Sequence, residues 1–379
     1  MSSKILHIQG KQRPDLLSIV KLQDFDYIEG EDIESKTILE KSNISLYCLD
    51  LQNQKAIFVE TPSNIFLADA SFVHQTQYEY AQKLIAVPFQ DLFQLAEAWE
   101  SPIKQLVIVY SVGRCGSTLL SKVFNQVDSV VSLSEPDFFS QIVAIRNTDG
   151  SNDQEITQLL KICIVLLGKT TLKGESSCLI IKLRSFCIEL GDLIYKAYPD
   201  AKVLFLYRNL EDVVKSSIRA FVFLSTMLPT IAQNIDVYSK FIPLLKDYAN
   251  YIDFNDPNAI DVYTASWLSV MQRYLLLRQQ GITICALRYE DLLANPHQMV
   301  TSIFKYCDLP TDEVHQACEA FKTDAHSNSN LSWKKINNNG VEIPDASKIR
   351  QKIEKLLNRH PEIKQSNFIV PGTLLLAND

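Results

Sequence analysis

Four short runs of consecutive apolar residues constrain the fold of this chain more than any other feature. They alternate with stretches of helical periodicity, a pattern typical of strands that are buried on both faces of a parallel sheet. The runs are Leu106–Tyr110 (LVIVY), Leu179–Leu183 (LIIKL), Val203–Tyr207 (VLFLY) and Thr283–Leu287 (TICAL). Helices are expected from Leu119 to Gln126 and from Leu210 to Phe221. We therefore predict an α/β fold, a three-layer α/β/α sandwich with a central parallel sheet, whose ligands bind at the carboxyl ends of the strands.

The first 100 residues lack this alternation, and we predict that they form an accessory region of unknown role. Within it, residues 44–60 are expected to form a hairpin, and helical periodicity runs from about Gln75 to Trp99. Residues 101–379 are predicted to form the main domain. In that domain the stretch 223–280 is expected to be a helical insertion, with Trp267 in its packing face.

The composition indicates a soluble, folded protein that does not bind nucleic acid. Of the 379 residues, 46% are apolar and 21% are charged, and the formal net charge is −7, whereas nucleic acids select basic surfaces. No apolar run reaches the length of about 20 residues that a membrane helix needs, and no signal peptide is evident. The eight cysteines show no CxxC spacing and lie mostly in apolar stretches. They predict reduced core thiols and a cytoplasmic location, and no residue cluster has metal-ligand spacing.

The run LVIVY leads into a loop that is suited to binding an anion. The loop and the start of the next helix read Ser-Val-Gly-Arg-Cys-Gly-Ser-Thr, from Ser111 to Thr118. A glycine-bearing loop between a strand and a helix presents backbone N–H groups to an anion, and Arg114 adds a positive charge. A Walker A loop requires a lysine after its last glycine, whereas here Ser117 follows Gly116 directly. The loop therefore does not match that of an ordinary ATPase or kinase.

The segment GRCGSTLL resembles the 5′-phosphosulfate loop of sulfotransferases that use 3′-phosphoadenosine 5′-phosphosulfate (PAPS). The resemblance implies that the loop binds the 5′-phosphosulfate and that the next residue lies beside the adenine. The residues that it assigns to PAPS binding in this loop are Arg114, Cys115, Gly116, Ser117, Thr118 and Leu119. Cys115 replaces the usual small serine, and Leu119 replaces a frequent tryptophan. A plain tight turn between strand and helix is the alternative interpretation of the loop.

Two further segments extend the resemblance to residues 105–345. Arg208 ends the run VLFLY, and Ser216 follows eight positions later, which is the spacing of the family's 3′-phosphate ligands. Between them, Asn209 is expected to cap a helix, with Asp212 as its capping-box partner. Tyr289 begins a YEDL segment like the one in which the family's tyrosine contacts the adenine. A late loop usually completes the 3′-phosphate site; Ser329, Lys334 and Lys335 are the alternatives here.

The resemblance also implies the catalytic residues. Lys182 corresponds to a lysine that contacts the transferring group, with Arg114 as a second positive charge. The family's usual histidine base is replaced by Arg184, which cannot accept a proton at neutral pH. Glu135 lies 21 residues after Arg114, similar to the position of the glutamate base in protein-tyrosine sulfotransferases. We therefore predict Glu135 as the general base, and the alternative is His74 from the accessory region.

The function that follows is transfer of a sulfuryl group from PAPS to a hydroxyl or amine acceptor, with release of PAP and without a metal. The expected partners are PAPS and a small-molecule or peptide acceptor of unknown identity. Two other interpretations are a nucleotide-dependent phosphotransferase with a P-loop and a non-catalytic nucleotide-binding protein. The first requires a Walker lysine, which the loop does not contain. The second treats Arg184 as a sign of a decayed active site.

Overall fold

A computed structural model describes residues 2–15, 18–98, 103–171, 176–327, 329 and 331–375. The chain forms two compact units. The first comprises Met1–Ile108, Phe124–Leu183 and Asp192–Ala201, and the second comprises Val109–Val123, Arg184–Gly191 and Lys202–Asp379. The predicted division into domains at about residue 100 stays a prediction.

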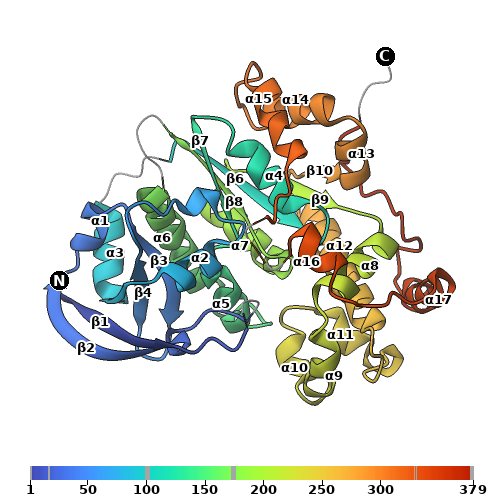
Figure 1. Cartoon of the computed structure of the whole chain (residues 1–379), viewed down its shortest axis with the longest axis horizontal. Helices are drawn as coiled ribbons and strands as arrows, with labels where there is room; N and C mark the ends of the chain where they lie inside the picture. Colours follow the sequence, from blue (N-terminus) through green and yellow to red (C-terminus); the bar gives the residue numbers. More distant parts are fainter. Residues whose placement is uncertain are drawn as a thin grey trace. The chain divides into compact units, whose positions relative to one another are not determined.

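The first unit contains an antiparallel sheet built from N-terminal residues, in the order β2-β1-β5-β4-β3. Figure 1 shows β1 and β2 as a long, curved pair in blue. The strands are β1 (Ser2–Lys11), β2 (Phe25–Glu34), β3 (Ile44–Asp50), β4 (Lys55–Glu60) and β5 (Lys83–Pro88). Strands β3 and β4 pair from Ile44 opposite Glu60 to Asp50 opposite Lys55, so the predicted hairpin is confirmed.

The helical periodicity from about Gln75 to Trp99 holds only for parts of that stretch. That stretch contains α2 (Val73–Tyr80), strand β5 and α3 (Phe89–Ala98), and Trp99 lies outside the described residues. Strand β5 pairs with β1 on one side and with β4 on the other. Its segment Lys83–Pro88 (KLIAVP) is therefore a central strand, because pairing on both edges outweighs the helical periodicity of the flanking residues.

The second sheet has the order β10-β9-β6-β8-β7. The strands are β6 (Gln105–Ser111), β7 (Val130–Ser134), β8 (Cys178–Lys182), β9 (Lys202–Tyr207) and β10 (Cys285–Arg288). Strand β10 runs parallel to β9, and β7 runs parallel to β8. Four strands were expected from the sequence and β7 was not. The predicted α/β fold with a central parallel sheet is confirmed.

Helices account for most of the remaining described chain. In the first unit they include α1 (Thr37–Glu40), α5 (Phe138–Ile145), α6 (Asp153–Thr171) and α7 (Gly191–Ala197), of which α5 and α6 contact β3. In the second unit they are α4 (Ser117–Phe124), α8 (Leu210–Ala220), α9 (Leu224–Gln233), α10 (Ile235–Tyr238), α11 (Leu244–Asp247), α12 (Ile260–Gln279), α13 (Tyr289–Ala294), α14 (Pro296–Tyr306), α15 (Val314–Ala317), α16 (Trp333–Asn337) and α17 (Ala346–Leu357).

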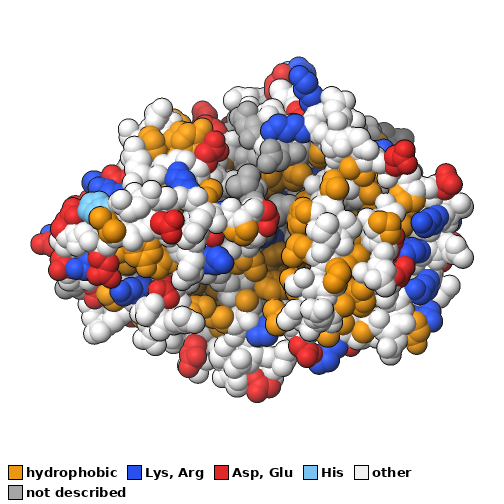
Figure 2. Space-filling model, turned by 60° about the horizontal axis from the view of Figure 1, so that its bottom comes forward, with side chains coloured by type: hydrophobic (Ala, Val, Ile, Leu, Met, Phe, Trp, Pro, Cys, Tyr) orange, Lys and Arg blue, Asp and Glu red, His pale blue; other side chains and the backbone are white. Residues whose placement is uncertain are grey.

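The stretch 223–280 is helical, as expected, and contains α9 to α12 with turns between them, whereas its role as an insertion stays a prediction. Helix α12 covers β9, since the rings of Phe205 and Tyr274 stack with centroids 4.4 Å apart. Trp267 is buried in the packing face of α12, as expected. Before and within the shorter helices, Val222, Phe223 and Val237 remain exposed. The face drawn in Figure 2 carries hydrophobic side chains in several patches among charged ones.

Two expectations from the sequence concern the state of the cysteines and the presence of membrane-spanning helices. Seven of the eight cysteines are buried and all eight are free thiols, which confirms the prediction of core thiols. Within the described ranges, no helix combines the length and the apolar character required to cross a membrane.

Candidate functional site

The loop between β6 and α4 has the geometry of an anion-binding loop. Its backbone φ angles are positive at Gly113 (+76°), Arg114 (+52°) and Gly116 (+81°). A loop with left-handed residues can turn successive N–H groups toward a bound anion, and this loop stands immediately before the N-terminus of α4. The side chain of Cys115 is buried and its thiol contacts the carbonyl of Leu206 at 3.3 Å. The thiol of Cys115 is therefore held by β9.

Two arginines and a serine from separate segments meet beside this loop. Arg114 donates from Nε to the hydroxyl of Ser216 at 3.0 Å, and Arg208 donates from Nη1 to the carbonyl of Arg114 at 3.3 Å. The Nε of Arg208 is buried and has no hydrogen-bond partner among the described residues. The structure thus brings together three residues that the sequence predicted as ligands of the nucleotide.

Tyr289 packs against the same loop. Its ring lies 4.8 Å from the guanidinium carbon of Arg208, and it also covers the backbone of Gly116. A Cβ atom added to Gly116 would lie within 2.8 Å of Cδ2 of Tyr289 and closer still to Cε2. Glycine is required at this position both for its positive φ and for this close approach.

Three contacts hold the end of β9 in place, and only the last of them was expected from the sequence. The indole Nε1–H of Trp267 donates to the carbonyl of Arg208 at 3.1 Å. The N–H of Asn209 donates to the carboxylate of Glu290 at 3.0 Å, while the Asn209 side chain accepts from the N–H of Glu211 at 2.9 Å.

These contacts confirm the predicted cap and correct one detail of it. Asn209 caps α8, but Asp212 is not its capping-box partner. Asp212 instead lies 3.6 Å from Arg208, because the N–H of Asn209 already bonds to Glu290.

In the first unit, Glu135 and Lys182 form an ion pair at the ends of two neighbouring strands. Lys182 is the last residue of β8, and its partner in the sheet is Ser134, the last residue of β7. The ammonium of Lys182 contacts the carboxylate of Glu135, and the two side chains are 4% and 14% exposed. Each of the two largely buried charges therefore has a counter-charge in direct contact.

Glu135 has an unusual backbone conformation. Its φ is +57°, which costs about 1–3 kcal/mol for a residue other than glycine. Pro136 follows it and favours an extended conformation for the preceding residue, which Glu135 does not adopt. The N–H of Glu135 donates to the carbonyl of Lys182 at 2.7 Å, so the turn is hydrogen-bonded as well as ion-paired.

Two side chains from the N-terminal region contact this pair. His74 is fully buried and its Nδ1 lies 2.9 Å from the carbonyl oxygen of Glu135. The ring of Phe72 lies 5.7 Å from the ammonium of Lys182. Sequence analysis gave His74 only as an alternative base and did not identify Phe72. No local pattern in the sequence could have placed either of them, because they lie about 60 and 110 residues from their partners.

The other predicted residues occupy a range of environments. Ser117 and Thr118 are buried at the start of α4, and Leu119 is half-buried. Arg184 is largely buried with its guanidinium 6.0 Å from the ring of Phe186.

The alternatives for the late loop also differ in their surroundings. The hydroxyl of Ser329 accepts from the N–H of Leu331. Lys334 and Lys335 are exposed on α16, which contacts α8, the helix that carries Ser216. The choice among these three residues stays a prediction.

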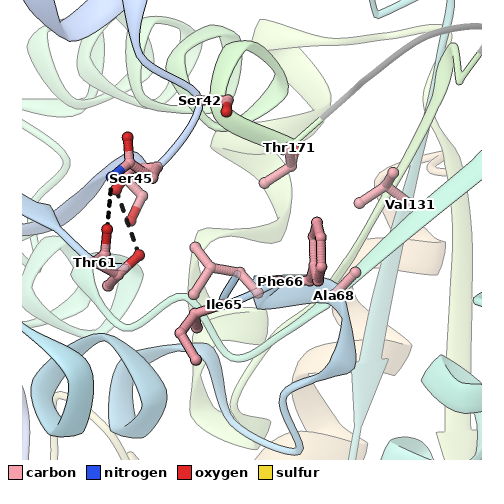
Figure 3. A pocket seen from close by; sticks show the side chains of 10 residues that line it. Ser42, Ser45, Thr61, Ile65, Phe66, Ala68, Val131 and Thr171 are labelled. Atoms are coloured by element: carbon pink, nitrogen blue, oxygen red, sulfur yellow. Dashed lines mark hydrogen bonds between the residues drawn. The ribbon is translucent and has the colours of Figure 1, made fainter. Parts of the chain in front are cut away.

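A hollow in the first unit is lined by none of these residues. Figure 3 shows hydroxyl side chains of Ser45 and Thr61 on one side of it and the apolar Ile65 and Phe66 on the other. The residues that line it carry no charge, so it does not suit a phosphosulfate. In the parts of the chain that the structure describes, no group of three or more His, Cys, Asp or Glu side chains is arranged to hold a metal.

Comparisons with known proteins give a match to a family model and several similar solved structures. A family model described as the sulfotransferase domain matches residues 104–356. A sulfotransferase structure from Alicyclobacillus acidocaldarius has a TM-score of 0.34 at 17% identity and covers 65% of this chain and 99% of its own. One from Mycobacterium tuberculosis has a TM-score of 0.37 at 13% identity and covers 69% and 81%. A search of curated proteins finds no match.

Proposed function

This chain belongs to the sulfotransferase family, and from that premise we propose that it transfers a sulfuryl group from PAPS to a hydroxyl or amine acceptor. PAP, the desulfated nucleotide, is the second product. The observation that carries the proposal is the convergence of Arg114, Arg208 and Ser216 on one loop. The two arginines bring positive charge to this loop, and arginine side chains are well suited to binding phosphate groups.

The 3′-phosphate of the nucleotide is the anion that we assign to Arg208 and Ser216. The buried Nε–H of Arg208 lacks an acceptor among the described residues, and a buried donor without a partner is costly. A phosphate oxygen would supply that acceptor. Tyr289 would contact the adenine, and the backbone of the loop with Ser117 and Thr118 would hold the 5′-phosphosulfate.

In the proposed reaction, Glu135 and Lys182 act on the transferring group. The acceptor oxygen or nitrogen attacks sulfur and loses its proton to the carboxylate of Glu135. The bond from sulfur to the bridging oxygen of PAPS breaks, and PAP leaves with the electron pair. Lys182, with Arg114, neutralises the charge that develops on that oxygen, a contribution of the kind made by oxyanion-hole donors. The ion pair between Glu135 and Lys182 supports this assignment, since it holds the two proposed groups side by side at the ends of neighbouring strands.

Calorimetric titration with PAP, AMP and ATP in the absence of magnesium tests the proposal. We expect PAP to bind more tightly than AMP or ATP, because only PAP carries the 3′-phosphate. Equal affinity for PAP and AMP would contradict the proposal. Tight binding of PAP without consumption of PAPS would instead favour the non-catalytic alternative.

The variant Arg208→Ala should weaken PAP binding about 10- to 100-fold, the effect expected when a charged hydrogen-bond donor to a phosphate is lost. AMP binding should change much less. Arg219→Ala is the matched control, because Arg219 is an exposed arginine on α8, the helix that follows Arg208. Its PAP affinity should equal that of the unmodified protein.

A further inference from the structure

The turn that carries Glu135 is contacted at several points by the N-terminal region, residues 2–98. That region has no assigned role, and the family model that matches this chain begins at residue 104. We propose that it serves as a support for the Glu135 turn, and that His74 is the positioning residue that fixes the Glu135 backbone. This inference rests on the proposed function, in which Glu135 is the base.

His74 forms a hydrogen bond directly with Glu135, the residue whose backbone is strained. A carbonyl oxygen only accepts hydrogen bonds, so the Nδ1 of His74 carries the hydrogen atom. It donates a hydrogen bond of 2.9 Å to the Glu135 carbonyl. On the other side of the same residue, the Glu135 N–H donates to Lys182 at 2.7 Å. Both peptide groups that flank the Glu135 Cα are therefore hydrogen-bonded. A positive φ at this position persists only where surrounding contacts impose it.

His74 is suited to positioning and not to accepting a proton from a substrate. Its side chain is fully buried and lies in the first turn of α2, directly after Phe72 and Val73. Phe72 places its ring 6.0 Å from that of His74 and 5.7 Å from the ammonium of Lys182. One short segment of the N-terminal region thus contacts both members of the ion pair.

Two more contacts fix the residues that follow Glu135. The N–H of Val20 donates to the carboxylate of Asp137 at 2.9 Å. Leu49 and Gln141 exchange two hydrogen bonds, one from the Leu49 N–H at 2.8 Å and one from the Gln141 amide at 3.0 Å. Asp137 and Gln141 lie at the start of α5, so contacts from three separate N-terminal segments hold this turn and the helix after it.

The test compares the full-length variants His74→Ala, His74→Asn and Gln77→Ala. Gln77 is the matched control because it is equally buried on the same helix, α2. Its amide donates to Ser45 and Leu46 instead of to Glu135. Asparagine can present an N–H near the position of the histidine Nδ1, so His74→Asn tests rescue by a conservative change.

The first readout is hydrogen exchange in peptides that cover residues 130–141. We expect His74→Ala to speed exchange there at least about tenfold, because the Glu135 N–H loses its fixed geometry. Gln77→Ala should leave exchange in these peptides unchanged. Unchanged exchange in His74→Ala would overturn the inference, and this readout needs no substrate.

The second readout is the release of PAP from PAPS with water as the acceptor. For His74→Ala we expect kcat to fall about 10- to 100-fold with little change in KM for PAPS, as is typical when a reacting group is displaced by about 1 Å. His74→Asn should recover most of kcat, and Gln77→Ala should stay within about twofold of the unmodified protein. Equal kcat in His74→Ala and Gln77→Ala would overturn the inference. If the unmodified protein does not consume PAPS, it is the proposed function that fails.

Discussion

Gly116 combines two constraints in one residue, a positive φ and a tyrosine ring in van der Waals contact. Gly116→Ala should lower both the melting temperature and the affinity for PAP, since a Cβ would push the ring of Tyr289 away from the loop. Gly281→Ala separates the two effects. Gly281 has a similar φ of +85°, but no atom lies within 4 Å of the position of its Cβ.

The difference in stability between these two variants measures only the clash of the added Cβ with the Tyr289 ring. The backbone cost of a side chain at positive φ is the same in both, roughly 1 kcal/mol. Thermal melting and calorimetry with PAP are the measurements. We expect the PAP affinity of Gly281→Ala to match that of the unmodified protein. If Gly116→Ala behaves like Gly281→Ala in both measurements, the Tyr289 ring does not belong to the nucleotide site.

The carboxylate of Glu135 is expected to be essential for turnover. Glu135→Gln keeps the shape of the side chain but cannot take the proton, so turnover should fall about 10²–10⁴-fold while PAP affinity stays near that of the unmodified protein. The melting temperature should also fall, because the largely buried Lys182 loses its counter-charge.

Glu60→Gln is the control for that stability effect. Glu60 is 12% exposed and is paired with Lys41 and Lys83, so its replacement also removes a partly buried carboxylate from an ion pair in the first unit. Rates should be compared at a temperature at which both variants are folded. Comparable turnover in the two variants would refute the assignment of Glu135 as the base.

At the scale of elements, the C-terminal end of α6 rests on the N-terminal region through a buried lysine. Lys169 donates hydrogen bonds to the carbonyls of Ile38 and Lys41, at the two ends of α1. Burial lowers the pKa of Lys169 from 10.5 to about 8, because the charged form is poorly solvated there. Its charge therefore opposes folding.

This lowered pKa predicts a pH dependence of stability. Below about pH 8 Lys169 is charged in both the folded and unfolded states, so folding carries the full cost of burying that charge. Between about pH 8 and 10.5 the folded state loses this proton first, so the free energy of unfolding should rise with pH relative to Lys169→Met. The rise is at most about 3 kcal/mol, less the share lost to solvent screening. Denaturant unfolding of both proteins across this pH range measures it, and parallel curves would contradict the expectation.

The elements also differ in how well the sequence predicted them. Strands β6, β8 and β9 were expected within one residue of their observed bounds, because a continuous apolar run is a local signal. Strand β7 (VVSLS) is shorter and contains two serines, and it is a strand because it pairs along β8. Strand β5 likewise depends on partners that are distant in the sequence.

At the scale of the whole molecule, the N-terminal residues are predicted to be required for the stability of the main domain. A fragment that comprises residues 101–379 would lose the partners of Asp137, Gln141 and Lys169. It would also expose the apolar sides of α5 and α6, which contact β3. We expect the fragment to be insoluble or to melt at a much lower temperature than the full chain. Soluble yield and thermal melting decide this, and a fragment as stable as the full chain would show that the region is a separate appendage.

The sequence alone predicted the parallel sheet, the loop after its first strand, and the residues that we propose as ligands of the nucleotide. Each of these depends on residues that are adjacent or one to two helical turns apart, as in the loop from Gly113 to Thr118 or the pair Arg208 and Ser216. Spacing of this kind is fixed by backbone geometry, so it can be predicted without tertiary contacts.

Only the tertiary structure decided which distant side chains hold these residues in place. Trp267 bonds to Arg208 across 59 residues of sequence, and His74 bonds to Glu135 across 61. Neither pair has a local pattern, since a hydrogen bond between distant segments depends on how the chain folds as a whole. The strained conformation of Glu135 is of the same kind, because its positive φ is imposed by neighbours that its own sequence does not specify.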